Sequence, residues 1–112
     1  MVSLFIDAAP DQIKAACDTG AECIEIHTGH YADAKLSSDI DREYNTIVEA
    51  IEQARVLGLR VNVGHGLNYH NTQRLVPIAA IEEFSIGHSI IARAVMVGIE
   101  RAVREMLDII RG

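Results

Sequence analysis

The sequence lacks several features that would define a protein class at once. It contains no tryptophan, two prolines and only two cysteines among 112 residues. Cys17 and Cys23 therefore indicate neither a disulfide framework nor a metal-binding pair, and we expect two buried, reduced thiols. No apolar run approaches the ~20 residues that span a bilayer, and residues 1–7 show neither the basic segment nor the cleavage site of a signal peptide. We expect a cytoplasmic protein with no membrane partner.

Long blocks of like charge are also absent. Ten Lys and Arg residues and sixteen Asp and Glu residues are dispersed along the chain and give a net charge of −6. Nucleic acids and anionic membranes recruit basic patches, so the expected partner is instead a small molecule or another protein. The length and the 49% hydrophobic content are typical of one soluble domain over residues 1–112. A complete eight-stranded α/β barrel, however, typically takes about 250 residues.

Apolar runs alternate with amphipathic segments along the whole chain. The four predicted strands are Val2 to Ile6, Glu22 to Ile26, Leu59 to Val63 and Glu83 to Ile86. The predicted helical segments are Asp11 to Asp18, closed by Gly20; Ser38 onward, closed by Gly58; a weak turn from Thr72 to Val76; and one long helix from Ser89 to Arg111 that buries Ile91, Val95, Ala102, Met106 and Ile110. Because strands alternate with helices without hairpin signals, we expect an α/β fold with a parallel sheet.

The polar loops after these strands are expected to meet at one edge of the sheet, because parallel strands end on the same side. Gly87-His88-Ser89 leads into the last helix, and a helix N-terminus approached through glycine is suited to bind phosphate. Gly64-His65-Gly66 follows the third strand, where an imidazole that titrates near neutrality can serve as an acid or base. The alternative for both segments is a tight turn with a structural histidine.

Glu25 is a carboxylate inside the otherwise apolar second strand. Burying a carboxylate is costly unless it is paired or functional, and parallel sheets are normally covered on both faces. A functional role is therefore favoured over simple exposure. A competing hypothesis assigns His27, His65 and His88 to zinc, which takes three protein ligands and a water in catalytic sites. No HExxH or CxxC spacing supports it, and neither a metal nor a cofactor is expected.

Four motifs together resemble the pyridoxine 5′-phosphate synthase family. They are Val2 to Asp7; Glu25-Ile26-His27-Thr28-Gly29 with Tyr31-Ala32; Val61-Asn62 with Gly64-His65-Gly66-Leu67 and Tyr69-His70-Asn71; and Ile86-Gly87-His88 with Ile90-Ile91 and Arg93-Ala94-Val95. The resemblance covers the chain from end to end. It implies the C-terminal half of an eight-unit barrel, that is, a (β/α)₄ half TIM barrel.

The resemblance also implies an activity in vitamin B6 biosynthesis. The family condenses 1-deoxy-D-xylulose 5-phosphate with 3-amino-2-oxopropyl phosphate and releases phosphate and water. By resemblance, His65 is the proton donor and Glu25 stabilises the transition state, while Gly66, Gly87 and His88 bind the phosphate of the aminoketone. A further catalytic histidine and glutamate come from the N-terminal half in this family, so we expect the half barrel to be inactive alone.

A half barrel leaves open surfaces. Two sheet edges and one uncovered apolar face are expected, which favours self-association into a pseudo-symmetric barrel or pairing with a complementary N-terminal half. The rival functions are a non-catalytic phosphate-binding or structural module and, through the three histidines, a zinc-dependent hydrolase.

Overall fold

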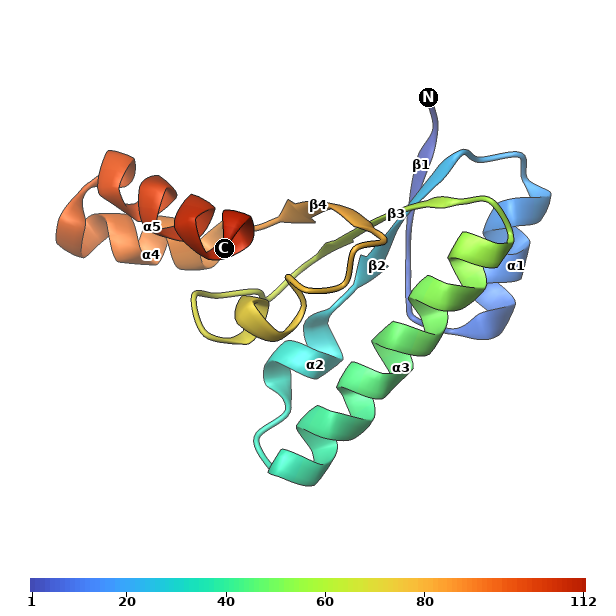
Figure 1. The fold of residues 1–112 in the computed structure, drawn as a ribbon, viewed down its shortest axis with the longest axis horizontal. Coiled ribbons are helices and arrows are strands. Elements are labelled where there is room, and N and C mark those ends of the chain that lie inside the picture. The colour runs from blue at the N-terminus through green and yellow to red at the C-terminus, as the bar shows by residue number, and fades with distance from the viewer.

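Four parallel strands form the centre of the computed structural model, which describes all residues from Met1 to Gly112 (Figure 1). The strands are bonded in chain order and are β1 (Ser3–Ile6), β2 (Cys23–His27), β3 (Arg60–Gly64) and β4 (Ile81–Ser85). The helices are α1 (Pro10–Asp18), α2 (Gly29–Asp33), α3 (Ser37–Val56), α4 (His88–Val97) and α5 (Ile99–Arg111), with the 3-10 turn η1 (Asn71–Arg74) between β3 and β4. The predicted α/β class and the parallel pairing are confirmed.

Two glycines end helices as predicted. Gly20 follows α1 and Gly58 follows α3, and their φ angles of 84° and 80° lie in the left-handed region that glycine adopts without strain. The short helix α2 differs from the prediction, because His27 to Leu36 is predicted as a loop. A helix of five residues is too short to show a hydrophobic periodicity.

The core lies between the sheet and helices α1 and α3, which cover one sheet face (Figure 1). Alternate residues of the two central strands point into it, and these four side chains are at most 1% exposed: Ile24, Ile26, Val61 and Val63. Ile13 of α1 and Ile47 and Ile51 of α3 belong to the same buried cluster. Because successive side chains of a strand alternate, Glu25 must point to the opposite face.

That opposite face is polar, and no helix packs over it. Its residues on the three strands β2 to β4 include Cys23, Glu25, His27, Arg60, Asn62, Glu83 and Ser85. The prediction of an uncovered apolar face is therefore wrong, because the side chains that alternate away from the core are mostly charged or polar. Both cysteines are free, as predicted, but only Cys23 is buried, whereas Cys17 is half-buried.

The C-terminal segment forms two helices instead of the single predicted one. Gly98, with a φ of 89°, separates α4 from α5, and the two helices pack side by side away from the sheet (Figure 1). Ala102 and Met106 are buried as predicted, but Ile91 and Val95 are 60% and 81% exposed, because α4 packs mainly against α5. None of the helices is both long and apolar enough to cross a membrane.

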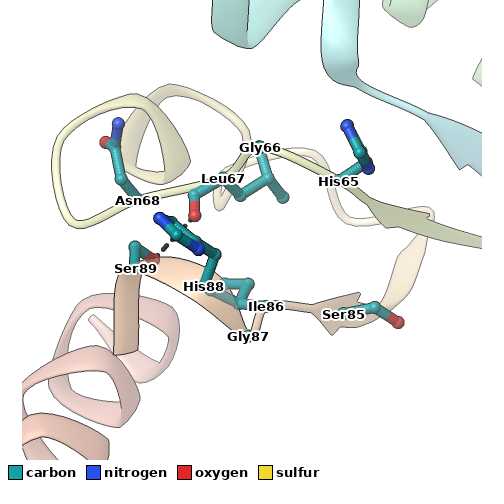
Figure 2. Close-up of a pocket in the computed structure, with 9 residues that line it drawn as sticks. All are labelled: His65, Gly66, Leu67, Asn68, Ser85, Ile86, Gly87, His88 and Ser89. Atoms are coloured by element: carbon teal, nitrogen blue, oxygen red, sulfur yellow. Dashed lines mark hydrogen bonds between the residues drawn. The ribbon is translucent and has the colours of Figure 1, made fainter. Parts of the chain in front are cut away.

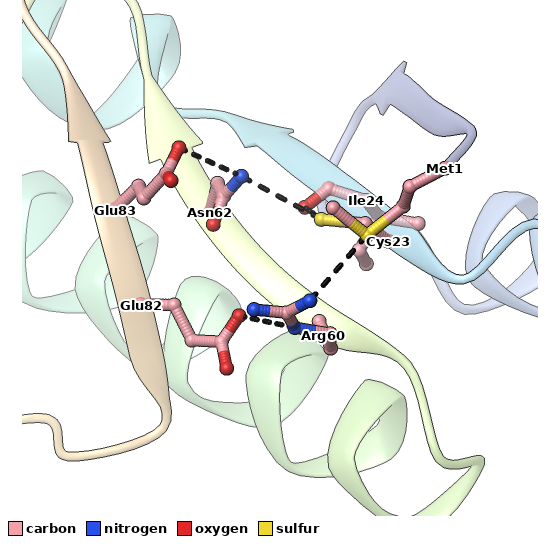
Figure 3. Close-up of polar contacts among 7 residues, drawn as sticks. All are labelled: Met1, Cys23, Ile24, Arg60, Asn62, Glu82 and Glu83. Atoms are coloured by element: carbon pink, nitrogen blue, oxygen red, sulfur yellow. Dashed lines mark hydrogen bonds and ion pairs between the residues drawn. The ribbon is translucent and has the colours of Figure 1, made fainter.

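A bulge in β4 sets its position against β3. The register runs Val61 to Ile81, Asn62 to Glu83, Val63 to Phe84 and Gly64 to Ser85. Glu82 is thus an extra residue, and both Glu82 and Glu83 are directed to the polar face (Figure 3). There Arg60 donates to Glu82 over 2.7 Å, and Asn62 donates to Glu83 over 3.5 Å. The bulge brings Ser85 level with the end of β3.

Candidate functional site

The polar side chains at the carboxyl ends of the strands form a row across the sheet. His27 of β2 is in register with Gly64 of β3, which is in register with Ser85 of β4. Glu25 lies two residues before His27 on the same face, beside Asn62. The predicted convergence of strand-end residues on one edge of the sheet is therefore observed.

Glu25 is fixed by a residue that the sequence does not single out. Ser85 donates a hydrogen bond from Oγ to Oε1 of Glu25 over 2.7 Å. Gly64 lies between them: a Cβ at this position would stand 2.9 Å from Oε2 of Glu25 and 2.9 Å from Cβ of Ser85. Glycine is required here because the two side chains already occupy the space. The only sequence signal for Ser85 is its place at the end of the fourth predicted strand.

His65 follows Gly64 and leaves the sheet in an unusual backbone conformation. Its φ of 88° makes it the only non-glycine residue of the chain with a positive φ. Its exposed imidazole stacks on that of His27, with ring centroids 4.4 Å apart and planes inclined by 23°. Nδ1 of His27 accepts a bond from the Gly29 N–H over 3.2 Å. A neutral His27 therefore carries its proton on Nε2. The His27 ring covers one side of the His65 ring.

A pocket of ≈ 550 Å³ opens between the loops after β3 and β4 (Figure 2). Its nine lining residues are His65, Gly66, Leu67, Asn68, Ser85, Ile86, Gly87, His88 and Ser89. Four of the five predicted site residues line it, and the fifth, Glu25, is bonded to the lining residue Ser85. The pocket therefore brings together the imidazole of His65, the N-terminus of α4, and Ser85, which is bonded to the carboxylate of Glu25.

Two further bonds hold the loop after β3 against its neighbours. Ser89, in the first turn of α4, donates from Oγ to the Leu67 carbonyl over 2.8 Å, which ties α4 to the loop that carries His65 and Gly66. Tyr31 of α2 donates to the Asn71 carbonyl over 2.6 Å, and burial raises the pKa of the Tyr31 hydroxyl. The first turn of α4 leaves backbone N–H groups without helical partners, which can bind an anion.

The three histidines of the zinc hypothesis are not gathered into a metal-binding group. His27 and His65 are stacked, and nowhere in the chain do three or more His, Cys, Asp or Glu side chains come together in a way that could hold a metal ion.

Fold and pocket together define a parallel α/β protein with its candidate site at the carboxyl ends of the strands, where α/β-barrel enzymes have theirs. The family model described as pyridoxal phosphate biosynthesis protein PdxJ matches residues 1–112, and the chain belongs to this family. It is 56% identical over 109 residues to the pyridoxine 5′-phosphate synthase of Maridesulfovibrio salexigens, covering 97% of this chain and 45% of that protein. It is 53% identical over 111 residues to that of Geobacter sp. (strain M21), covering 99% and 46%. The resemblance stated from the motifs is confirmed, and the chain spans less than half the length of these relatives.

Proposed function

We propose that these residues supply one half of a pyridoxine 5′-phosphate synthase site, which condenses 1-deoxy-D-xylulose 5-phosphate with 3-amino-2-oxopropyl phosphate. The observation that carries the proposal is the pocket, because it joins His65, Gly66, Gly87 and His88 from two separate motifs. Similarity over the whole chain to proteins named pyridoxine 5′-phosphate synthase supports the same activity.

In this proposal the phosphate of the aminoketone binds at the start of α4. The N–H groups of the first turn and the positive end of the helix dipole favour an anion. Gly87 and Gly66 let the backbone approach the phosphate oxygens, and the exposed imidazole of His88 adds a donor from the same turn. The phosphate anchors the substrate, and its carbon chain then extends toward His65.

His65 and Glu25 carry the chemistry. His65 donates a proton to the departing oxygen, a task suited to an exposed imidazole that operates near neutral pH. Glu25, held by Ser85, offers a carboxylate in a fixed direction, which stabilises a cationic imine as positive charge develops. Ring closure needs further proton transfers, and in this proposal the acid-base groups for them lie in the other half of the barrel.

The four-stranded sheet is completed by a second half in this proposal. Its polar open face becomes the interior of a TIM barrel, and a complementary N-terminal half or another copy of this chain supplies the other strands. Light scattering tests self-association: dimers at micromolar concentration are expected for pairing between copies, and a monomer at all concentrations contradicts it.

A direct assay tests the activity. Pyridoxine 5′-phosphate formation is measured for the protein alone and after addition of the complementary segment of the Maridesulfovibrio salexigens relative. Product only in the mixture supports the half-site proposal. Absence of product in both favours the second candidate, a phosphate-binding module without catalysis, which keeps the pocket at the start of α4.

Inorganic phosphate tests the binding site separately from catalysis. At a concentration 100 times its Kd, a ligand stabilises the folded state by about 2.7 kcal/mol. This protection against thermal unfolding is expected for the wild type and should be lost in His88→Ala. His70→Ala is the matched control, because His70 is an exposed loop histidine that does not line the pocket. Equal protection in both variants contradicts the assignment of His88.

A further inference from the structure

Thr28 uses its side chain in an unexpected way. It occupies the N-cap position of α2, where a threonine hydroxyl ordinarily accepts a bond from an N–H of the first turn. No such bond is formed. The hydroxyl instead faces the end of β3 and lies 2.7 Å from the carbonyl oxygens of both Gly64 and His65, between which it shares its proton. The Thr28 N–H also donates to the Gly64 carbonyl over 2.8 Å.

Because Thr28 is buried, the two carbonyl groups depend on its hydroxyl as a hydrogen-bond donor. Thr28 is 0% exposed, so no solvent molecule replaces its hydroxyl as a donor to the two carbonyl groups. Of the fully buried side chains in the chain, only two are polar, Thr28 and Thr72, and the Oγ1 atom of Thr72 has no hydrogen-bond partner. The two threonines are therefore equally buried, but only the hydroxyl of Thr28 forms hydrogen bonds.

The bonded carbonyl belongs to a strained residue. A φ of 88° brings the Cβ of an L-residue close to its own backbone, and such a conformation persists only where the surroundings impose it. The residues on both sides of His65 are glycines, whose backbone is more flexible than that of any other residue and therefore does little to hold His65 in this conformation. β3 pairing holds the chain up to Gly64, and the Thr28 hydroxyl holds the carbonyl of His65 itself.

We infer that Thr28 is the positioning residue for His65: its buried hydroxyl fixes the His65 peptide and thereby the left-handed turn that aims the imidazole at His27 and the pocket. The catalytic consequence rests on the proposed function of His65, whereas the conformational consequence does not. Stacking on His27 alone would orient the ring but leave the peptide free to rotate.

Three variants separate the hydroxyl from the bulk of the side chain. Thr28→Val removes the hydroxyl and keeps the shape, and Thr28→Ser keeps the hydroxyl. Thr72→Val is the matched control, because it removes a buried hydroxyl that bonds to nothing. The NMR signature of a positive φ is a strong cross-peak between the amide and α protons of one residue. This peak is expected for His65 in the wild type, Thr28→Ser and Thr72→Val, and is expected to weaken in Thr28→Val.

Kinetics of pyridoxine 5′-phosphate formation, measured with the complementary segment of the Maridesulfovibrio salexigens relative added, provide a second readout. Misplacing a catalytic group without removing it lowers the rate of the chemical step, so Thr28→Val should reduce kcat by about tenfold or more while KM changes little. Thr28→Ser should restore most of kcat, and Thr72→Val should leave it unchanged. An unaltered His65 cross-peak together with an unaltered kcat in Thr28→Val overturns the inference.

Failure of the proposed function and failure of this inference give different results. A wild type that stays inactive after addition of the complementary segment contradicts the function, but the His65 cross-peak still decides the role of Thr28. If Thr28→Val does not fold, the same change is made together with His65→Gly, since glycine needs no help in a left-handed turn. Folding of the double variant supports the inference, and its failure to fold shows that the hydroxyl is required for another reason and overturns the inference.

Discussion

Adding one methyl group at Gly64 tests the geometry around Glu25. Gly64 does not have a positive φ, so its backbone accepts alanine and only the neighbouring atoms oppose the change. In Gly64→Ala the new Cβ would stand 2.9 Å from Oε2 of Glu25 and 2.9 Å from Cβ of Ser85. Both distances are shorter than those that real Cβ atoms show, so each of the two contacts must be relieved by a shift.

The cost of each shift depends on the neighbour that moves. The Glu25 carboxylate is the end of a flexible side chain and can rotate away, which breaks its bond to Ser85 but disturbs little else. The Ser85 Cβ is attached directly to β4, so relieving that contact requires a shift of the strand. Overpacking of this kind costs about 1–3 kcal/mol, and the strand shift places Gly64→Ala toward the upper end. With roughly 4 °C per kcal/mol for a domain of this size, the Tm should fall by about 8–12 °C.

Calorimetry and urea unfolding measure the loss, and a second variant identifies its cause. Removing the Ser85 side chain in Gly64→Ala/Ser85→Gly relieves one of the two contacts, so the double variant should recover part of the lost stability. Glu25 loses its direction in both variants, and synthase activity should therefore stay low in both. A Gly64→Ala variant with wild-type Tm and activity would refute the reasoning, because Glu25 and Ser85 would then not fill this space.

Loss of the Ser85 hydroxyl in Ser85→Ala should lower kcat by about tenfold through misorientation of Glu25 while changing the free energy of unfolding by only about 1 kcal/mol; steady-state kinetics and urea unfolding check both. Hydrogen bonds from Arg93 and Arg101 hold the pKa of Glu105 below its ordinary value of 4.5. The ion pair that joins α4 to α5 is thus present above that pH and lost as the pH falls through the lowered value. Amide protection factors in α4 should drop in acid, and Glu105→Gln should show the drop at pH 7; pH-independent protection would contradict this.

Most of the fold follows from local patterns. Alternating apolar residues such as Val61 and Val63 identify a strand, because successive side chains of a strand point to opposite faces and only one face of this sheet is covered by helices. Gly20 and Gly58 mark the helix ends because only glycine takes a left-handed conformation without cost. The edge that carries the site also follows, since parallel strands end on one side, and His65 and His88 indeed line one pocket there.

What could not be predicted depends on tertiary packing. The helix from Ser89 to Arg111 has an unbroken apolar pattern, and Gly98 costs a helix only about 1 kcal/mol, so periodicity does not reveal the break. The exposure of Ile91 and Val95 likewise follows from where α4 packs and not from its sequence. The left-handed turn at His65 is imposed by contacts with another loop, which no local propensity encodes.

The bulge in β4 connects the fold to the site. If Glu82 were paired with Asn62 in a regular strand instead of bulging out, the pairing of β3 with β4 would place Phe84 level with Gly64, and a phenylalanine ring would stand beside Glu25. The bulge places Ser85 there instead, with its hydroxyl 2.7 Å from the carboxylate. The identity of the partner of Glu25 is therefore decided by strand register. A one-residue change in register alters every contact along a strand, so the carboxylate could be found in the sequence and its partner could not.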